Sequence, residues 1–215
     1  MNLSSPSLFV GQGLPQAGWH QLLESWSDVM TRFIKTAKGS SSGEDIPYWY
    51  NEYSNVGFLA AAVWKLGGVA IQEYTVDRVA EDAKKSKGRC DLWICLPEFG
   101  MEYAIEAKFS CKSTPESAIK DCRERMNEAM AQIRTYDPTK REACQQMAAV
   151  FMAPYNQSAS DAESILDVLW EAFSGGSMNP NSVCAVYRPP VGSNVEDEEK
   201  GIRSYYPGVA LFAQL

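Results

Sequence analysis

Apolar residues recur at helical spacing in several segments of the chain. The clearest stripe lies between residues 16 and 38 and consists of Trp19, Leu22, Leu23, Trp26, Val29, Met30, Phe33 and Ile34. This spacing predicts an amphipathic helix. A second helix is predicted from about Pro47 to Leu66, because proline suits a first turn and Gly67-Gly68 a stop. Two more helices are predicted over residues 114–138 and 160–176.

Shorter apolar or alternating segments predict strands at 69–79, 145–155, 182–190 and 208–215. The segment RCDLWICLPEFGMEYAIEAKFS, residues 89–110, predicts a hairpin of two strands about a turn at 97–100. The polar start of the chain and the acidic segment 192–201 are expected to be loops. This order of elements predicts an α/β fold, a mixed β-sheet with helices on both faces.

The length of 215 residues suits one globular unit. We expect an N-terminal amphipathic helix and linker at 1–45, followed by the main domain at 46–215. No apolar run reaches the roughly 18 to 20 residues that span a bilayer, and the start lacks the layout of a secretory signal. The six cysteines are scattered without a C-x-x-C pair, as expected of thiols in a reducing compartment. The expected location is therefore the cytoplasm, with no membrane partner.

Two acids and a lysine interrupt the apolar strands of the predicted hairpin. If Leu96 pairs with Met101, then Asp91 lies opposite Glu106, and Lys108 shares their face of the sheet. Like charges on directly opposed residues destabilise a sheet, because their Cβ atoms are roughly 4.5 to 5.5 Å apart. A positive charge is therefore expected between them, and a divalent ion with oxygen ligands fits.

Asp91 together with Glu106-Ala107-Lys108 resembles the PD-(D/E)XK nuclease superfamily. Glu52 is similar to the helix glutamate that often precedes this motif, and Gln132 with Tyr136 resembles the Q-x-x-x-Y element of nucleases similar to the RecB nuclease domain. The resemblance covers about residues 47–155. Cys90 stands where the family name has proline. The resemblance implies a restriction-endonuclease-like core.

The resemblance also implies a role for each residue. Asp91, Glu106 and the backbone carbonyl of Ala107 would bind Mg²⁺ or Mn²⁺, and Lys108 would position the attacking water. Glu52 would act through water or a second ion. Contacts to the substrate would come from Gln132, Tyr136, Lys112 and Arg134. The implied activity is metal-dependent hydrolysis of phosphodiester bonds in DNA, with RNA as an alternative substrate.

The net charge of −7 argues against a protein that coats nucleic acid non-specifically. A second interpretation is a weak or inactive nuclease-fold module that acts by binding nucleic acid or a protein partner, which the acidic surface would suit. A third is an RNA-cutting toxin or defence effector. Cutting of both strands would favour a homodimer. The single histidine, His20, argues against a two-histidine metal site and against Ser-His or Cys-His catalysis.

Simpler structural roles remain open for the same residues. Lys108 and Glu106 can form a salt bridge, Asp91 can bond to backbone at a strand start, and Glu52 can oppose a helix dipole. Gln132 and Tyr136, four apart, are expected on one helix face, partly buried or in contact with substrate. Glu73 is a weaker candidate on the preceding strand. The cluster Tyr48, Trp49, Tyr50 and Tyr53 is interpreted first as a hydrophobic cap and second as a stacking surface for unpaired bases.

Overall fold

The computed structural model describes residues 7–38, 45–79, 85–136, 144–174, 179–189, 193–197 and 202–215. Its helices are α1 (Gln16–Lys38), α2 (Glu52–Lys65), the short 3₁₀ helix η1 (Pro97–Phe99), α3 (Pro115–Ile133) and α4 (Ala159–Ser174). Its strands are β1 (Ser7–Val10), β2 (Val69–Val79), β3 (Lys85–Leu96), β4 (Met101–Ser110), β5 (Gln145–Met152), β6 (Ser182–Tyr187), β7 (Ser193–Asp197), β8 (Ile202–Tyr206) and β9 (Val209–Gln214).

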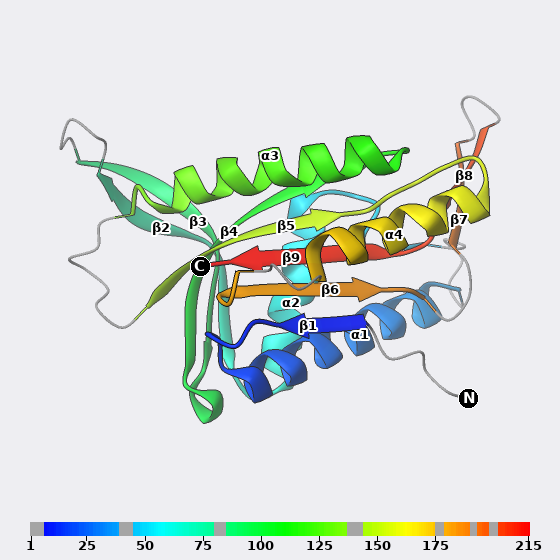
Figure 1. Ribbon diagram of the computed structural model, residues 1–215. Coiled ribbons are helices and arrows are strands. Elements are labelled where there is room, and N and C mark those ends of the chain that lie inside the picture. The colour runs from blue at the N-terminus through cyan, green and yellow to red at the C-terminus, as the bar shows by residue number, and fades with distance from the viewer. Residues whose placement is uncertain are drawn as a thin grey trace.

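Within the described residues, seven strands form one sheet in the order β1-β6-β9-β5-β4-β3-β2. β4 and β5 run parallel, whereas the other neighbouring pairs are antiparallel. A core under α1 and α2 includes Trp19 and Leu59, and a core under α3 and α4 includes Cys122 and Leu166. The helices thus cover both faces of the sheet (Figure 1). The predicted α/β fold with a mixed sheet is confirmed.

The central hairpin has the predicted register. Leu96 pairs with Met101, and the pairing of β3 with β4 continues to Leu92 and Ile105. The turn is η1 followed by Gly100, whose φ of 62° lies in the left-handed region that favours glycine. The alternation of apolar residues fixed this register, because a slip by one residue would turn the buried face to solvent.

Two helix boundaries differ from the prediction. α2 begins at Glu52 rather than at Pro47, because the side chain of Asn51 accepts a hydrogen bond from Ser54 N (3.0 Å) and caps the first turn. α3 begins as expected after its cap Thr114, but its last residue is Ile133. Tyr136 therefore lies beyond the helix, and the prediction that Gln132 and Tyr136 share one helix face is wrong.

Two strands lie where loops were expected, and a third lies at 202–206, where no element was predicted. Ser7–Val10 pairs with β6 at one edge of the sheet, and Ser193–Asp197 pairs with Ile202–Tyr206 in a separate two-stranded sheet. Backbone hydrogen bonds form such pairs without a long apolar pattern, which explains why the sequence pattern did not indicate them. β3 also begins at Lys85, four residues before the predicted start of the hairpin at residue 89.

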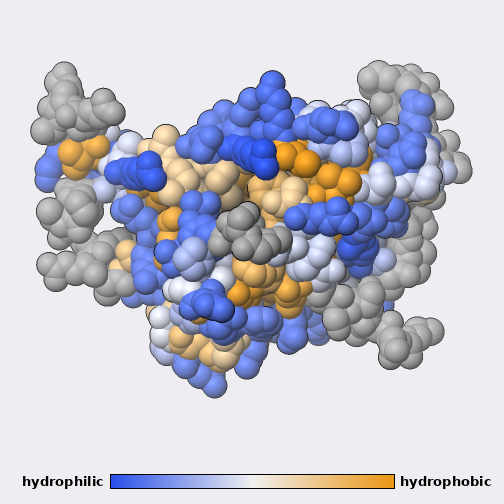
Figure 2. Space-filling model, in the orientation of Figure 1, coloured by the Kyte–Doolittle hydropathy of each residue, from blue (hydrophilic) through white to orange (hydrophobic). Residues whose placement is uncertain are grey.

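Hydrophilic residues cover most of the face seen in Figure 2, with apolar residues among them over α3 and α4.

No helix in the described segments is both long and apolar enough to cross a membrane.

Candidate metal centre

Asp91 and Glu106 lie at a fork in the sheet. The pairing of β3 with β4 ends at Leu92 and Ile105, one residue before the two acids. Past this point β3 continues beside β2 and β4 continues beside β5 (Figure 1). The Asp91 carboxylate spans the opening, where its Oδ2 accepts a hydrogen bond from Ala107 N (2.7 Å). Asp91 thus bonds to backbone, as the simpler interpretation allowed, and it also neighbours Glu106.

Glu106 is a fully buried carboxyl group. Its Oε1 accepts hydrogen bonds from Arg78 Nη2 (2.6 Å) and from the Tyr136 hydroxyl. Its Oε2 is buried and accepts no hydrogen bond. The pKa of Glu106 is raised to about 7, chiefly by burial and then by the carboxyl–carboxyl contact with Asp91, whereas Tyr136 and Arg78 oppose the rise. Oε1 is therefore fixed by two hydrogen bonds. Oε2 remains able to carry a proton or to bind a cation.

Arg78 supplies the positive charge beside Glu106, a role that no pattern in the sequence indicated. Besides Glu106, its guanidinium donates to the backbone oxygens of Arg89 (2.6 Å) and Gln132 (3.2 Å). It also lies over the Tyr136 ring, 4.8 Å from the centroid. Arg78 therefore ties together β2, β3, β4 and the end of α3, which are far apart in the sequence.

Gly88 makes room for this arginine. A Cβ atom added at Gly88 would lie 2.0 Å from Arg78 Nε and 2.5 Å from its Cδ. Contacts this short are not tolerated without displacement of one of the groups. The absence of a side chain at Gly88 thus lets the guanidinium reach Glu106.

Lys108 lies two residues after Glu106 on β4 and is half-buried. Its Nζ donates to the carbonyl of Ala107 (2.8 Å), whose N–H is bonded to Asp91. The N–H of Ala107 is thus bonded to the Asp91 carboxylate and its carbonyl to the Lys108 ammonium. Glu106 makes its salt bridge with Arg78, so the ion pair between Lys108 and Glu106 that the sequence left open is not the one formed.

Glu52 is brought to the same centre by the start of α2. Burial raises its pKa, the charge of Lys108 opposes this rise, and the charges of Asp91 and Glu73 add to it. These charges act on Glu52 only because all three groups lie near it. Glu52 therefore lies near the acid pair.

Glu73 has an unusual backbone conformation, with a φ of 53° in the middle of β2. Its neighbours Gln72 and Tyr74 pair with Leu92 and Cys90, so Glu73 lies at the level of Asp91. Left-handed backbone is strained for a residue other than glycine and is found mostly at turns and functional sites. Its carboxylate pairs with Arg89 (3.3 Å between Oε2 and Nη1).

The four residues predicted to contact substrate do not all lie at the acid pair. Tyr136 is buried, and its hydroxyl donates a hydrogen bond to Glu106 instead of facing a substrate. Gln132 contributes a backbone oxygen to Arg78. Lys112 pairs with Asp121 (3.4 Å), and Arg134 is exposed just past α3. Of the four, only Tyr136 makes a direct contact with the acid pair among the interactions of the described residues.

The acid pair offers two carboxylate groups as candidate metal ligands. Among the residues that the structure describes, no group of three or more His, Cys, Asp and Glu side chains is placed to hold a metal ion. Mg²⁺, however, is usually held by one or two carboxylates and completes its shell with water and phosphate. The buried, unpartnered Glu106 Oε2 beside Asp91 fits such an ion.

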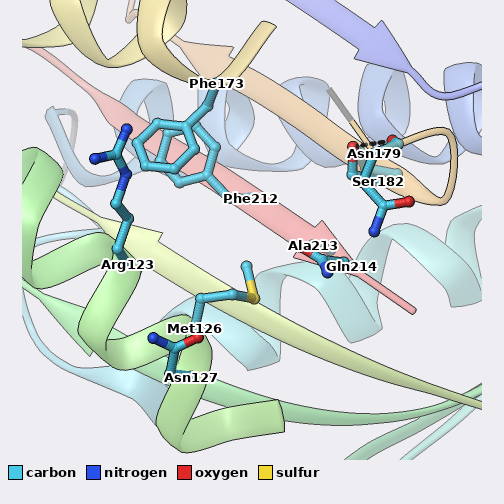
Figure 3. A pocket seen from close by; sticks show the side chains of 10 residues that line it. Arg123, Met126, Asn127, Phe173, Asn179, Ser182, Phe212, Ala213 and Gln214 are labelled. Atoms are coloured by element: carbon cyan, nitrogen blue, oxygen red, sulfur yellow. Dashed lines mark hydrogen bonds between the residues drawn. The ribbon is translucent and has the colours of Figure 1, made fainter. Parts of the chain in front are cut away.

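A separate pocket of about 300 Å³ lies between α3 and α4 over β6 and β9 (Figure 3). The rings of Phe173 and Phe212 contact each other there with centroids 4.3 Å apart, and Arg123 lies over Phe173. None of the candidate metal-site residues lines this pocket.

Comparison of the chain with protein-family models, with curated proteins and with solved structures gives no match. The function is therefore inferred from the geometry of the acid pair and its neighbours.

Proposed function

We propose that this protein is a metal-dependent nuclease of the PD-(D/E)XK type that hydrolyses phosphodiester bonds in DNA. One observation carries the proposal: Asp91 and Glu106 lie together at the fork of the hairpin, with Lys108 beside them and one buried Glu106 oxygen without a partner. The mixed sheet with helices on both faces agrees with the restriction-endonuclease-like core that the motif implies.

Each residue has a chemical task in this proposal. Asp91 and Glu106 hold a Mg²⁺ or Mn²⁺ ion, with the Ala107 carbonyl as a further ligand. That carbonyl oxygen has two lone pairs, so it can accept from Lys108 and still face an ion. Arg78 and Tyr136 fix Glu106 through Oε1, which leaves Oε2 for the ion.

The bound ion would lower the pKa of its water and offset charge that grows on the phosphate oxygens. The Lys108 ammonium would orient the attacking water and contact the scissile phosphate. Glu52, near the pair, would act on a bound ion through water. Because Glu106 has a pKa of about 7, it must lose its proton before it can ligate.

The remaining parts of the proposal concern location and partners. All six cysteines are free thiols, which supports a reducing compartment such as the cytoplasm. DNA is the proposed partner, with RNA as the alternative nucleic acid. A homodimer would supply two centres for cutting both strands.

A binding module is the second candidate function, and one observation favours it. The salt bridge from Arg78 to Glu106 already neutralises the buried acid without a metal ion. A protein that has lost catalysis would keep its fold through this contact.

Cleavage assays separate the two functions. The purified protein is incubated with linear duplex, supercoiled and single-stranded DNA, and with RNA, in Mg²⁺, Mn²⁺ or EDTA. The nuclease proposal predicts metal-dependent cutting that Asp91→Asn and Lys108→Ala both abolish, whereas Trp64→Ala, an exposed change on α2, leaves it intact. A folded wild type that cuts none of these substrates in either metal would favour the binding module.

A further inference from the structure

The aromatic cluster at the start of α2 is divided in two by the structure. Tyr48 is fully buried and its hydroxyl donates to the Tyr206 carbonyl (3.1 Å), and Trp49 packs edge-on against the Tyr206 ring. Tyr50 and Tyr53, in contrast, are 52% and 59% exposed. The hydrophobic cap predicted from the sequence therefore accounts for the first two rings and leaves the other two in solvent.

Tyr53 directly follows Glu52 in the first turn of α2, so its backbone lies next to that of a residue of the candidate centre. Consecutive Cα atoms are about 3.8 Å apart, and Glu52 is near enough to Asp91 and Lys108 for their charges to act on its carboxyl group. Tyr50 lies two residues before Glu52, on the other side of the Asn51 cap.

The backbone that carries these rings is well anchored. Asn51 caps α2 through Ser54 N, and its carbonyl accepts from Asn55 Nδ2 (2.8 Å). Ser54 Oγ donates to the Pro47 carbonyl (2.8 Å), which ties the segment before the helix to its first turn. The Tyr50 hydroxyl donates to Asp45 Oδ1 (2.7 Å). A ring held in this way loses little freedom when a planar group stacks on it.

Two cations lie near Glu52. The positive charges of Lys108 and Arg125 both act on its carboxyl group. Phosphates of a strand that passes the centre would meet these side chains while its bases meet the two rings. Exposed aromatic rings next to cations are the arrangement by which proteins bind single strands.

We propose that Tyr50 and Tyr53 stack on unpaired bases, so that the substrate is single-stranded DNA or an unpaired DNA end. This inference rests on the proposed nuclease function, because that function supplies the strand at the centre. Duplex DNA cannot use the two rings, since its bases are already stacked on each other and only their edges face the grooves. The tyrosines therefore select for unpaired substrate.

Binding is measured by fluorescence anisotropy with a labelled 20-nucleotide oligothymidine and with a labelled 20-base-pair duplex, in Ca²⁺ in place of Mg²⁺. The variants are Tyr50→Ala, Tyr53→Ala, Tyr53→Phe and Trp64→Ala. Trp64 is the matched control, because it is 56% exposed on the same helix but about 16 Å along the axis from Tyr53, at 1.5 Å per residue.

We expect each tyrosine-to-alanine change to weaken oligothymidine binding about thirtyfold, the middle of the range for loss of one stacked base. Tyr53→Phe keeps the ring and the affinity, and Trp64→Ala has no effect. Because all these side chains are exposed, unchanged thermal unfolding verifies that the variants are folded. Wild-type affinity in both alanine variants, or equal losses for duplex and single strand, would overturn the inference.

The same proteins are assayed for cleavage in Mg²⁺, which separates the two proposals. If cleavage depends on metal but is equal in wild type and in both tyrosine-to-alanine variants, the stacking inference is wrong and the nuclease function stands. If binding depends on the tyrosines but no protein cleaves, the stacking surface is supported and the nuclease function is wrong.

Discussion

Replacement of Glu106 by glutamine tests the buried acid pair without metal or substrate. The carboxyl group is fully buried, and its pKa is raised from 4.5 to about 7, first by burial and then by Asp91. Because the folded-state pKa lies above the unfolded-state value, the protein takes up a proton on folding. The stability that Glu106 contributes is therefore fully present below about pH 4.5 and is lost as the pH rises through about 7.

The size of this loss follows from the difference between the two pKa values. At about 1.4 kcal/mol per pKa unit, the wild type loses about 3 kcal/mol of unfolding free energy across this window. Glutamine has the same shape and can still accept from Arg78 and Tyr136 through its oxygen, but it does not titrate. The variant lacks this loss. The unfolding free energy of the wild type minus that of Glu106→Gln therefore falls as the pH rises.

Urea unfolding in EDTA, followed by circular dichroism at several pH values from about 5 to 8, measures this difference. Titration of other groups is common to both proteins and cancels. The expected relative slope is about 1.4 kcal/mol per pH unit below pH 7. Parallel stability curves for the two proteins, or a wild type that gains stability relative to the variant as the pH rises, would refute the reasoning.

Two further predictions concern the packing around the acid pair. Gly88→Ala should lower the unfolding free energy by about 1 to 3 kcal/mol, because the new Cβ atom would lie 2.0 Å from Arg78 Nε. Its control is Gly57→Ala within α2, where the nearest atoms are 3.9 Å away and better helix propensity should stabilise by up to about 1 kcal/mol. Both are checked by urea unfolding, and equal effects would count against the packing role of Gly88. Tyr136→Phe removes a hydrogen bond that lowers the pKa of Glu106, so the pH at which Mn²⁺ binding reaches half its maximum should move upward. An unchanged or lower midpoint would contradict this.

The sequence was sufficient to predict the hairpin, because its alternation of apolar residues has one register that buries them all. That register predicted Asp91 opposite Glu106 and Lys108 on their face, and in the structure the pairing ends one residue short of the two acids, at Leu92 and Ile105. Glu52 was predicted separately, from the resemblance. These features depend on neighbours in the chain or on one turn, and short-range patterns contain that information.

Arg78 was not predictable in the same way. It is 28 residues from Glu106 in the chain, and its role depends on the fork of the sheet, on the missing side chain at Gly88 and on the end of α3. That helix ends at Ile133 because the following residues turn back to β2, where Arg78 bonds to the Gln132 carbonyl. Tertiary contacts of this kind override local helix propensity. The same is true of β7 and β8, whose pairing has no apolar pattern.

The most direct test of the account is to count the Mn²⁺ ions bound at the acid pair. Electron paramagnetic resonance of free Mn²⁺ is measured during titration of wild type, Glu106→Gln and Trp64→Ala at about pH 8, where Glu106 is ionised. The account predicts saturable Mn²⁺ binding to wild type and to Trp64→Ala that Glu106→Gln abolishes or weakens at least tenfold. Equal binding by all three proteins, or none by the wild type, would contradict a metal centre at Asp91 and Glu106.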